Sequence, residues 1–267
     1  MTRTLLSLAL HAYALATVAY LVHLVRQMRA LAAVGRIAIG LGLALQGAAL
    51  LIQVLHQGGM LVGISQGLSL FAFLLLAIFL AIDLLYRRPV IGAFVTPIAL
   101  AVLLPSFLLR TASGPLPEAL RRPLLPVHVA IAILGVATFA VAAGVGLMYL
   151  LMERQVKLKR FGLLFARLPP LQVLDELNRG LVVLGFIALS ITLATGAIFD
   201  TEAGSWQWDP KRLATFVGWA VFAVLLSARF FGGWQGKRVA VVTMAGFALL
   251  LISFLSSYEP SALAGLH

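Results

Sequence analysis

Runs of about 20 apolar residues recur along the whole chain, and they constrain its fold more than any other feature. Such a run can cross a hydrocarbon layer roughly 30 Å thick as a helix. Of the 267 residues, 62% are hydrophobic and 11% charged, and the mean hydropathy is +1.05. Inside lipid, only helices satisfy every backbone polar group without closing a barrel. The sequence therefore predicts an all-α, polytopic membrane protein with one integral membrane domain over residues 1–267.

About eight transmembrane helices are expected, with no soluble domain between them. The first apolar run continues to Val25, which predicts an uncleaved span rather than a signal peptide. The fourth span contains Pro97 and Pro105, which favour a kink or a partial crossing. The expected spans are Leu5–Val25, Ile37–Leu55, Ile64–Leu85, Ile91–Leu109, Val127–Met152, Leu181–Phe199, Leu213–Ala228 and Val239–Ser257.

The Lys and Arg residues are divided unequally between the two sides that eight spans define. Of these 20 residues, 14 lie in the loops after spans one, three, five and seven. Cytoplasmic loops carry the excess of Lys and Arg in membrane proteins. We therefore expect a multi-pass protein of the bacterial inner membrane, with both termini on the outer, periplasmic side.

The longest connector on the basic side covers residues 153–180. Around Phe161 and Phe165 it resembles a helix that lies in the headgroup region and binds anionic lipid at the inner face. Pro169-Pro170 ends that segment, and a second short helix from Leu171 to Asn178 is expected to lead into span six. Two interpretations stay open: a solvated basic loop that only sets the topology, and a docking surface for a partner.

The connector between the sixth and seventh spans contains the stretch SWQWDPKR, from Ser205 to Arg212. One Trp beside a span needs no function, because Trp favours both membrane interfaces. Here, however, Trp206 and Trp208 are one residue apart and Asp209 follows directly. On this pattern alone, interfacial anchoring and specific ligand binding both stay open.

Three of the five histidines fall on the same predicted side as these tryptophans. His56 closes span two, His128 opens span five and His267 ends the chain, whereas His11 and His23 lie in span one. A neutral imidazole at an interface can ligate iron axially. The alternative for His128 is a helix-start residue bonded to water or headgroups. For His11, the alternative is a backbone contact between helices.

Several kinds of site are missing from the sequence. It has no cysteine, which excludes disulfides and thiolate metal sites, and it has no phosphate-binding glycine loop. The net charge of +11 is explained by the loop asymmetry, so nucleic acid is not an expected partner. Asp83 and Arg229 lie at span ends, where we expect them to reach headgroups. Glycines in spans two and five are expected to be packing notches: Gly40, Gly42, Gly47, Gly135, Gly144 and Gly146.

The C-terminal half carries a pattern of tryptophans at fixed spacing. Trp208-Asp209-Pro210-Lys211 is followed by Trp219, by Trp234-Gln235-Gly236-Lys237-Arg238 and by Gly246-Phe247. This pattern resembles the cytochrome c assembly family of haem-handling membrane proteins, which includes CcsA and CcmC, over about residues 127–258. Leu168-Pro169-Pro170-Leu171 and the GWQGKR loop most resemble the small HemX/YpjD branch.

The resemblance implies that haem is held at the outer membrane face. It implies that Trp206, Trp208 and Asp209 lie against the porphyrin and that His128 ligates the iron. His267 is similar to the family's second ligand, with His56 as the alternative. Lys211 or Arg212 is expected to pair with the propionates.

We therefore expect a haem-binding protein of cytochrome c biogenesis that delivers haem together with a membrane partner or to apocytochrome. Catalysis by this chain alone is not expected, because thioether formation involves thiols and the chain has none. The alternative is a non-catalytic membrane regulator or adaptor, such as a HemX-like control of haem synthesis. That role would use the basic connector to hold its partner.

Overall fold

The computed structural model describes residues 1–56, 63–109, 124–159, 162–203 and 210–255. These residues form helices joined by short turns, and no β-strand occurs among them. Eight of the helical segments are long and apolar enough to cross a membrane. The prediction of an all-α, polytopic membrane protein is confirmed.

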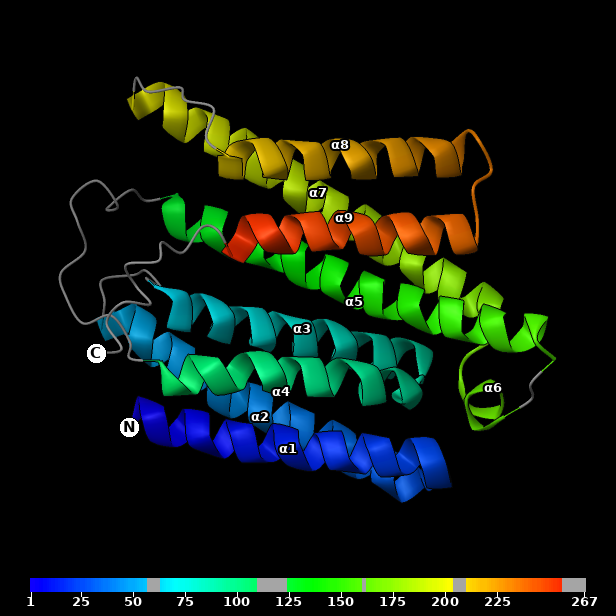
Figure 1. The fold of residues 1–267 in the computed structure, drawn as a ribbon. Coiled ribbons are helices and arrows are strands. Elements are labelled where there is room, and N and C mark those ends of the chain that lie inside the picture. Colours follow the sequence, from blue (N-terminus) through cyan, green and yellow to red (C-terminus); the bar gives the residue numbers. More distant parts are fainter. Residues whose placement is uncertain (57–62, 110–123, 160–161, 204–209, 256–267) are drawn as a thin grey trace. The chain divides into compact units, whose positions relative to one another are not determined.

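The chain divides into two compact units, whose helices are shown in Figure 1. Unit 1 consists of Met1–Pro126 and Phe161–Pro169, and unit 2 consists of Val127–Arg160 and Pro170–His267. That the two together form one membrane domain stays a prediction.

Unit 1 is built from four long helices: α1 (Thr2–Arg26), α2 (Arg29–His56), α3 (Ile64–Tyr86) and α4 (Gly92–Leu108). It also contains two short helices, η1 (Pro89–Ile91) and α6 (Leu163–Arg167). α1 packs on α2 and α4, and α3 packs on α4. Gly42 permits the close approach of α1, since a Cβ there would lie 2.3 Å from the Tyr13 ring. α4 continues through Pro97 and Pro105 as one helix.

A buried ion pair joins three helices of unit 1. α2 begins at Arg29 rather than at residue 37, so Arg36 lies within a helix and not in a loop. Its Nε donates to the fully buried Asp83 over 2.7 Å, and the Tyr20 hydroxyl donates to the same carboxylate over 3.3 Å. The expectation that Asp83 reaches headgroups is therefore wrong. A carboxylate among apolar helices is stabilised by a cationic side chain of a neighbouring helix, here Arg36 of α2.

Unit 2 is built from α5 (Leu125–Lys157), α7 (Leu171–Ala203), α8 (Pro210–Phe230) and α9 (Lys237–Leu255). Its core includes the fully buried rings of Phe139 and Phe222, which stack with centroids 3.8 Å apart. The expected short helix over 171–178 is wrong, because those residues form the first turns of α7.

Most of the predicted basic connector over 153–180 is thus the end of α5 and the start of α7. The helix expected in the headgroup region around Phe161 is reduced to α6, whose five residues include Phe165. Among the predicted glycine notches, four lie close to another helix: Gly42, Gly47, Gly135 and Gly146. Gly40 and Gly144 have no neighbouring atom within 4 Å in the described part of the chain, so for these two the prediction is wrong.

The helices of unit 2 define two ends, which Figure 1 shows. At one end, which we call the tryptophan end, α7 stops at Ala203, α8 starts at Pro210 and α5 starts at Leu125. The SWQWD tryptophans lie in sequence between α7 and α8. At the other end, the loop end, α5 stops, α7 starts, and residues 231–236 join α8 to α9.

Candidate functional site

His128 lies at the tryptophan end, in the first turns of α5, and its imidazole contacts α7. Its Nδ1 is 2.6 Å from Thr195 Oγ1. The ring packs edge-on against Phe199, with centroids 5.5 Å apart, and its Cε1 faces Gly196, where a Cβ would lie 3.6 Å away. One half-buried imidazole is therefore held by α7 residues that lie about two to three helical turns before the tryptophan segment in sequence.

A second aromatic cluster joins α7 to α8 in the same unit. Trp219 Nε1 donates to Ser190 Oγ over 2.9 Å. Its indole stacks on Phe186 of α7 and on Phe216 of α8, with centroids 5.7 and 5.8 Å away. Trp219 belongs to the pattern identified in the sequence, and here it has a structural role: it aligns the two helices that flank the tryptophan segment.

Several predicted site residues lie outside the described part of the chain. They are Trp206, Trp208, Asp209 and His267. The side chains of His56 and Lys211 also lie outside it, although the backbone places His56 at the end of α2 and Lys211 in the first turn of α8. Arg212 is half-buried in that same turn.

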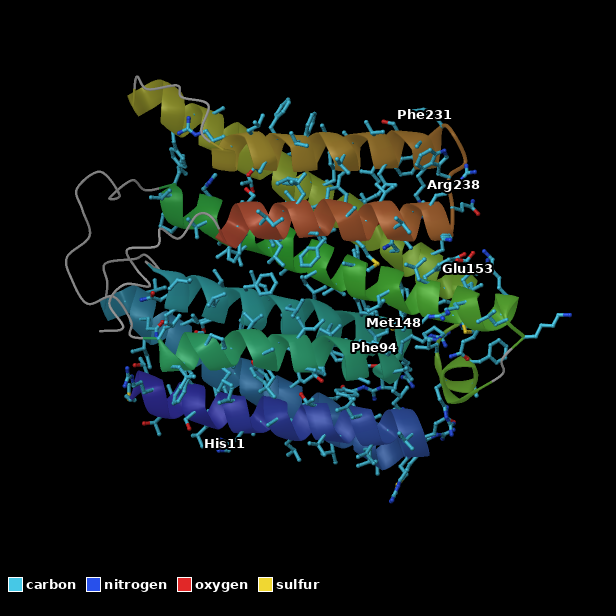
Figure 2. The ribbon with its side chains drawn as sticks, viewed as in Figure 1. His11, Phe94, Met148, Glu153, Phe231 and Arg238 are labelled. Atoms are coloured by element: carbon cyan, nitrogen blue, oxygen red, sulfur yellow. The ribbon has the colours of Figure 1, made fainter. Side chains whose placement is uncertain are left out.

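The two histidines of α1 have local partners. His11 is exposed on α1 (Figure 2), and its Nδ1 lies 2.7 Å from the carbonyl oxygen of Ser7 in the same helix. The expected contact between helices is therefore wrong for this residue. His23 Nδ1 lies 2.9 Å from the carbonyl oxygen of Met28, at the turn between α1 and α2. Both rings are accounted for by local structure.

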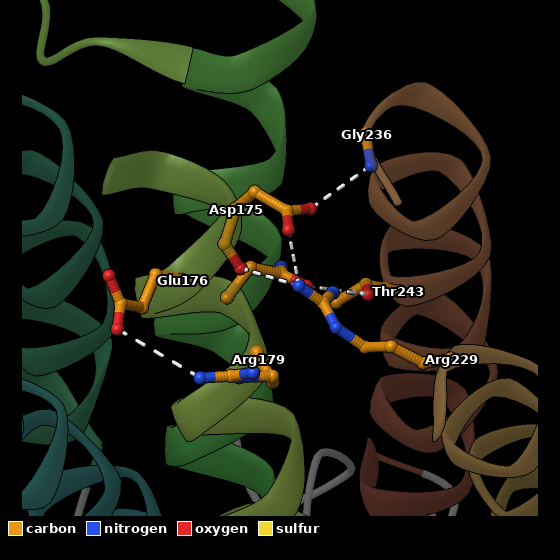
Figure 3. Close-up of polar contacts among 7 residues, drawn as sticks. Asp175, Glu176, Arg179, Arg229, Gly236 and Thr243 are labelled. Carbon is orange, nitrogen blue, oxygen red and sulfur yellow. Dashed lines mark hydrogen bonds and ion pairs between the residues drawn. The ribbon is translucent and has the colours of Figure 1, made fainter. Parts of the chain in front are cut away.

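The loop end carries a second polar cluster, centred on Asp175 of α7 (Figure 3). One carboxylate oxygen accepts from Arg229 Nη2 over 2.5 Å, and the other accepts from the backbone N–H of Gly236 over 3.0 Å. The Arg229 side chain is only 6% exposed. Arg229 was expected to reach headgroups, which is wrong: it links α8 to α7. Sequence reasoning missed this cluster, because nothing in the sequence pairs Asp175 with Arg229, which is 54 positions away.

A cavity of about 720 Å³ opens beside this cluster. It is lined by the end of α5, the start of α7, loop residues 232–236 and the first two residues of α9, with Tyr149, Glu153 and Asp175 among its walls. Figure 2 shows Glu153 and Arg238 at this end. Gly236 adopts a φ of +71°, and a Cβ on it would lie 2.6 Å from the Tyr149 hydroxyl. The loop can lie this close to α5 only because glycine occupies that position.

Comparison with known proteins decides the family. A family model described as Cytochrome C assembly protein matches residues 61–261. The chain belongs to this family. The predicted resemblance is confirmed, and the match starts at residue 61 rather than near 127, so that it takes in α3 and α4 of unit 1 as well as all of unit 2 up to the end of α9.

Several relatives carry the name cytochrome c biogenesis protein CcsA. The CcsA of Prochlorococcus marinus (strain NATL1A) is 29% identical over 207 residues, which cover 66% of each chain. That of another Prochlorococcus marinus strain is 30% identical over 205 residues, or 66% of this chain and 65% of the relative. That of Guillardia theta is 31% identical over 205 residues, or 67% of each chain. The matches thus span about two thirds of these curated relatives. Assignment to the HemX/YpjD branch stays a prediction.

Among the described residues, no group of three or more His, Asp or Glu side chains could hold a metal ion. A haem iron differs from such a metal site, because the porphyrin supplies four of its ligands and the protein only the axial ones. In the described part of the chain, His128 is an imidazole that contacts α7, the helix that precedes the tryptophan segment in sequence.

Proposed function

We propose that this multi-pass membrane protein holds haem at the tryptophan end of unit 2 and acts in cytochrome c biogenesis. Its relatives bear that name, and the matched region includes both His128 and the tryptophan segment. The chain would act as a subunit in haem delivery to apocytochrome, together with a membrane partner, and would not carry out ligation alone.

The observation that carries this proposal is the position of His128. Its imidazole contacts Thr195 and Phe199 of α7, and α7 leads within a few residues into the segment that contains Trp206 and Trp208. When bound, haem would supply an iron that takes axial nitrogen ligands, a large apolar macrocycle and two carboxylates. His128 would offer an imidazole to the iron, and the segment that follows α7 in sequence would offer indole rings to the macrocycle.

The remaining roles are assigned by the family pattern. Trp206, Trp208 and Asp209 would form the face against the porphyrin, and each tryptophan would contribute by burial of its ring. Lys211 or Arg212, at the start of α8, would pair with a propionate. The second axial ligand would be His267 or, failing that, His56. Anionic lipid would bind the basic side of the protein, in an inner membrane with both termini outside.

The test is the absorption spectrum of the protein purified from its membrane. We expect a Soret band in the wild type and loss of most of it in His128→Ala, because the axial bond holds the iron itself. His11→Ala is the matched control, since it removes an exposed imidazole of α1 that contacts only its own helix among the described residues. Wild-type protein that neither contains haem nor takes it up would refute the proposal.

A second function, that of a membrane regulator or adaptor, is favoured by the cavity at the loop end. Its walls combine residues from both ends of the predicted basic connector with Lys237 and Arg238. Their charged groups could bind a partner. Under this hypothesis, Lys237→Glu with Arg238→Glu would change the level of haem precursors in cells and leave covalent c-type haem unchanged. Arg87→Glu with Arg88→Glu, on an exposed and a half-buried residue outside both the cavity and the connector, is the control. A fall in c-type haem after deletion of the chain, with precursors unchanged, would favour haem delivery.

A further inference from the structure

The contact between His128 and Thr195 involves one ring nitrogen of the imidazole, Nδ1. A threonine hydroxyl carries one proton. The Thr195 hydroxyl lies 2.8 Å from the carbonyl oxygen of Ile191 and 3.1 Å from that of Thr192, and both oxygens can only accept, so its proton can be donated within its own helix. In that arrangement the Thr195 oxygen accepts from its third neighbour, with His128 Nδ1 as the donor over 2.6 Å.

A neutral imidazole with its proton on Nδ1 keeps the lone pair of Nε2 for a metal. The partner of the other ring nitrogen also sets the plane of the ring and makes the ligating nitrogen more basic. At His128 the plane is restricted further by the edge contact with Phe199 and by Gly196 beside Cε1. Three positions of α7 therefore define how this ring is presented.

From this geometry we infer that Thr195 is a positioning residue for haem: it holds His128 in the tautomer and orientation in which Nε2 ligates iron. The inference rests on the proposed haem-holding function and adds to it a residue that touches neither iron nor porphyrin. Thr195 showed no signal in the sequence, because a threonine in an apolar span usually bonds only its own helix.

The experiment compares Thr195→Val, Thr195→Ser and Thr192→Val in the full-length chain. Valine keeps the shape of threonine and removes the hydroxyl, whereas serine keeps the hydroxyl. Thr192 is the matched control, since its hydroxyl donates to Ala188 of its own helix, one turn from Thr195, as Thr195 does to Ile191. The readouts are haem retention during purification and the reduction potential of the bound haem.

We expect Thr195→Val to lower haem affinity by about tenfold, as loss of an outer partner of a metal-bound histidine typically does. Its potential should shift to more positive values, because a less basic imidazole stabilises ferric iron less. Thr195→Ser and Thr192→Val should behave like the wild type. Unchanged affinity and potential in Thr195→Val would overturn the inference, and so would equal losses in Thr192→Val, which would indicate a general packing effect.

A haem-independent measurement separates this inference from the proposed function. ¹⁵N NMR of histidine-labelled protein without haem should show His128 protonated at Nδ1 in the wild type, with that preference lost in Thr195→Val. A wild-type ring protonated at Nε2 would overturn the inference and leave haem binding by His128 standing. The expected tautomer in a protein whose haem spectrum is unaffected by His128→Ala would instead overturn the haem site.

Discussion

Replacing Asp175 with alanine should destabilise unit 2 far more than replacing its neighbour Glu176. Asp175 accepts from Arg229 Nη2 and from the Gly236 N–H, so it joins α7 both to the end of α8 and to the start of α9. Its removal would leave the Arg229 charge, whose side chain is 6% exposed, without its carboxylate. Breaking a buried pair from one side costs about 3–5 kcal/mol, and we expect the lower end because Asp175 itself is 21% exposed.

The assay is unfolding of the purified protein by SDS titration in mixed micelles, which reports the free energy of unfolding. Glu176→Ala is the matched control: its 3.9 Å contact with Arg179 joins side chains that are 68% and 52% exposed, and such pairs contribute at most about 0.5 kcal/mol. Because the cost arises from an unpaired charge, Asp175→Leu combined with Arg229→Met should be less destabilising than Asp175→Ala. Equal losses in Asp175→Ala and Glu176→Ala would refute this reasoning.

Two further predictions concern the loop end and the membrane orientation. Gly236→Ala should lower the free energy of unfolding by about 1–3 kcal/mol, because a Cβ there would meet a tyrosine hydroxyl at 2.6 Å on a backbone with φ of +71°. In the same titration, Gly144→Ala should have little effect, since no described atom lies within 4 Å of the position of its Cβ. Single cysteines at Gly204 and Gly265 should react with an impermeant thiol reagent in intact cells, and one at Gly162 should not; the absence of native cysteine makes the labelling specific. Reaction at Gly162 alone would reverse the predicted orientation.

Hydropathy was sufficient to predict the number of candidate membrane-spanning helices, because the backbone polar groups of each apolar run must form hydrogen bonds within that run in lipid. Hydropathy did not predict the helix boundaries correctly where the ends of the helices contain charged residues. Arg36 was assigned to a loop and Asp175 to a separate short helix, yet both lie in long helices. Each charge is compensated by a partner more than 45 residues away, Asp83 for the first and Arg229 for the second. A single sequence gives no sign of such a pairing.

The candidate site was predictable to a different degree for each kind of residue. His128 was found because it falls on the same predicted side of the membrane as the tryptophans and because the family pattern points to it. Thr195 was not found, since its role depends on the packing of α5 against α7. Likewise, Trp219 was identified from spacing alone, and the structure adds that Ser190 accepts its indole N–H.

α7 connects the two polar clusters of unit 2 and sets the distance between them. Asp175 and Thr195 are 20 positions apart on this one continuous helix, so at 1.5 Å per residue they are separated by about 30 Å along its axis. That length equals the thickness of a typical hydrocarbon core. If Thr195 and His128 lie at one membrane face, the cavity beside Asp175 must therefore open at or near the opposite face. Haem holding and any partner docking at the loop end would then take place on different sides of the membrane. The cysteine labelling that orients the tryptophan end would orient the cavity as well.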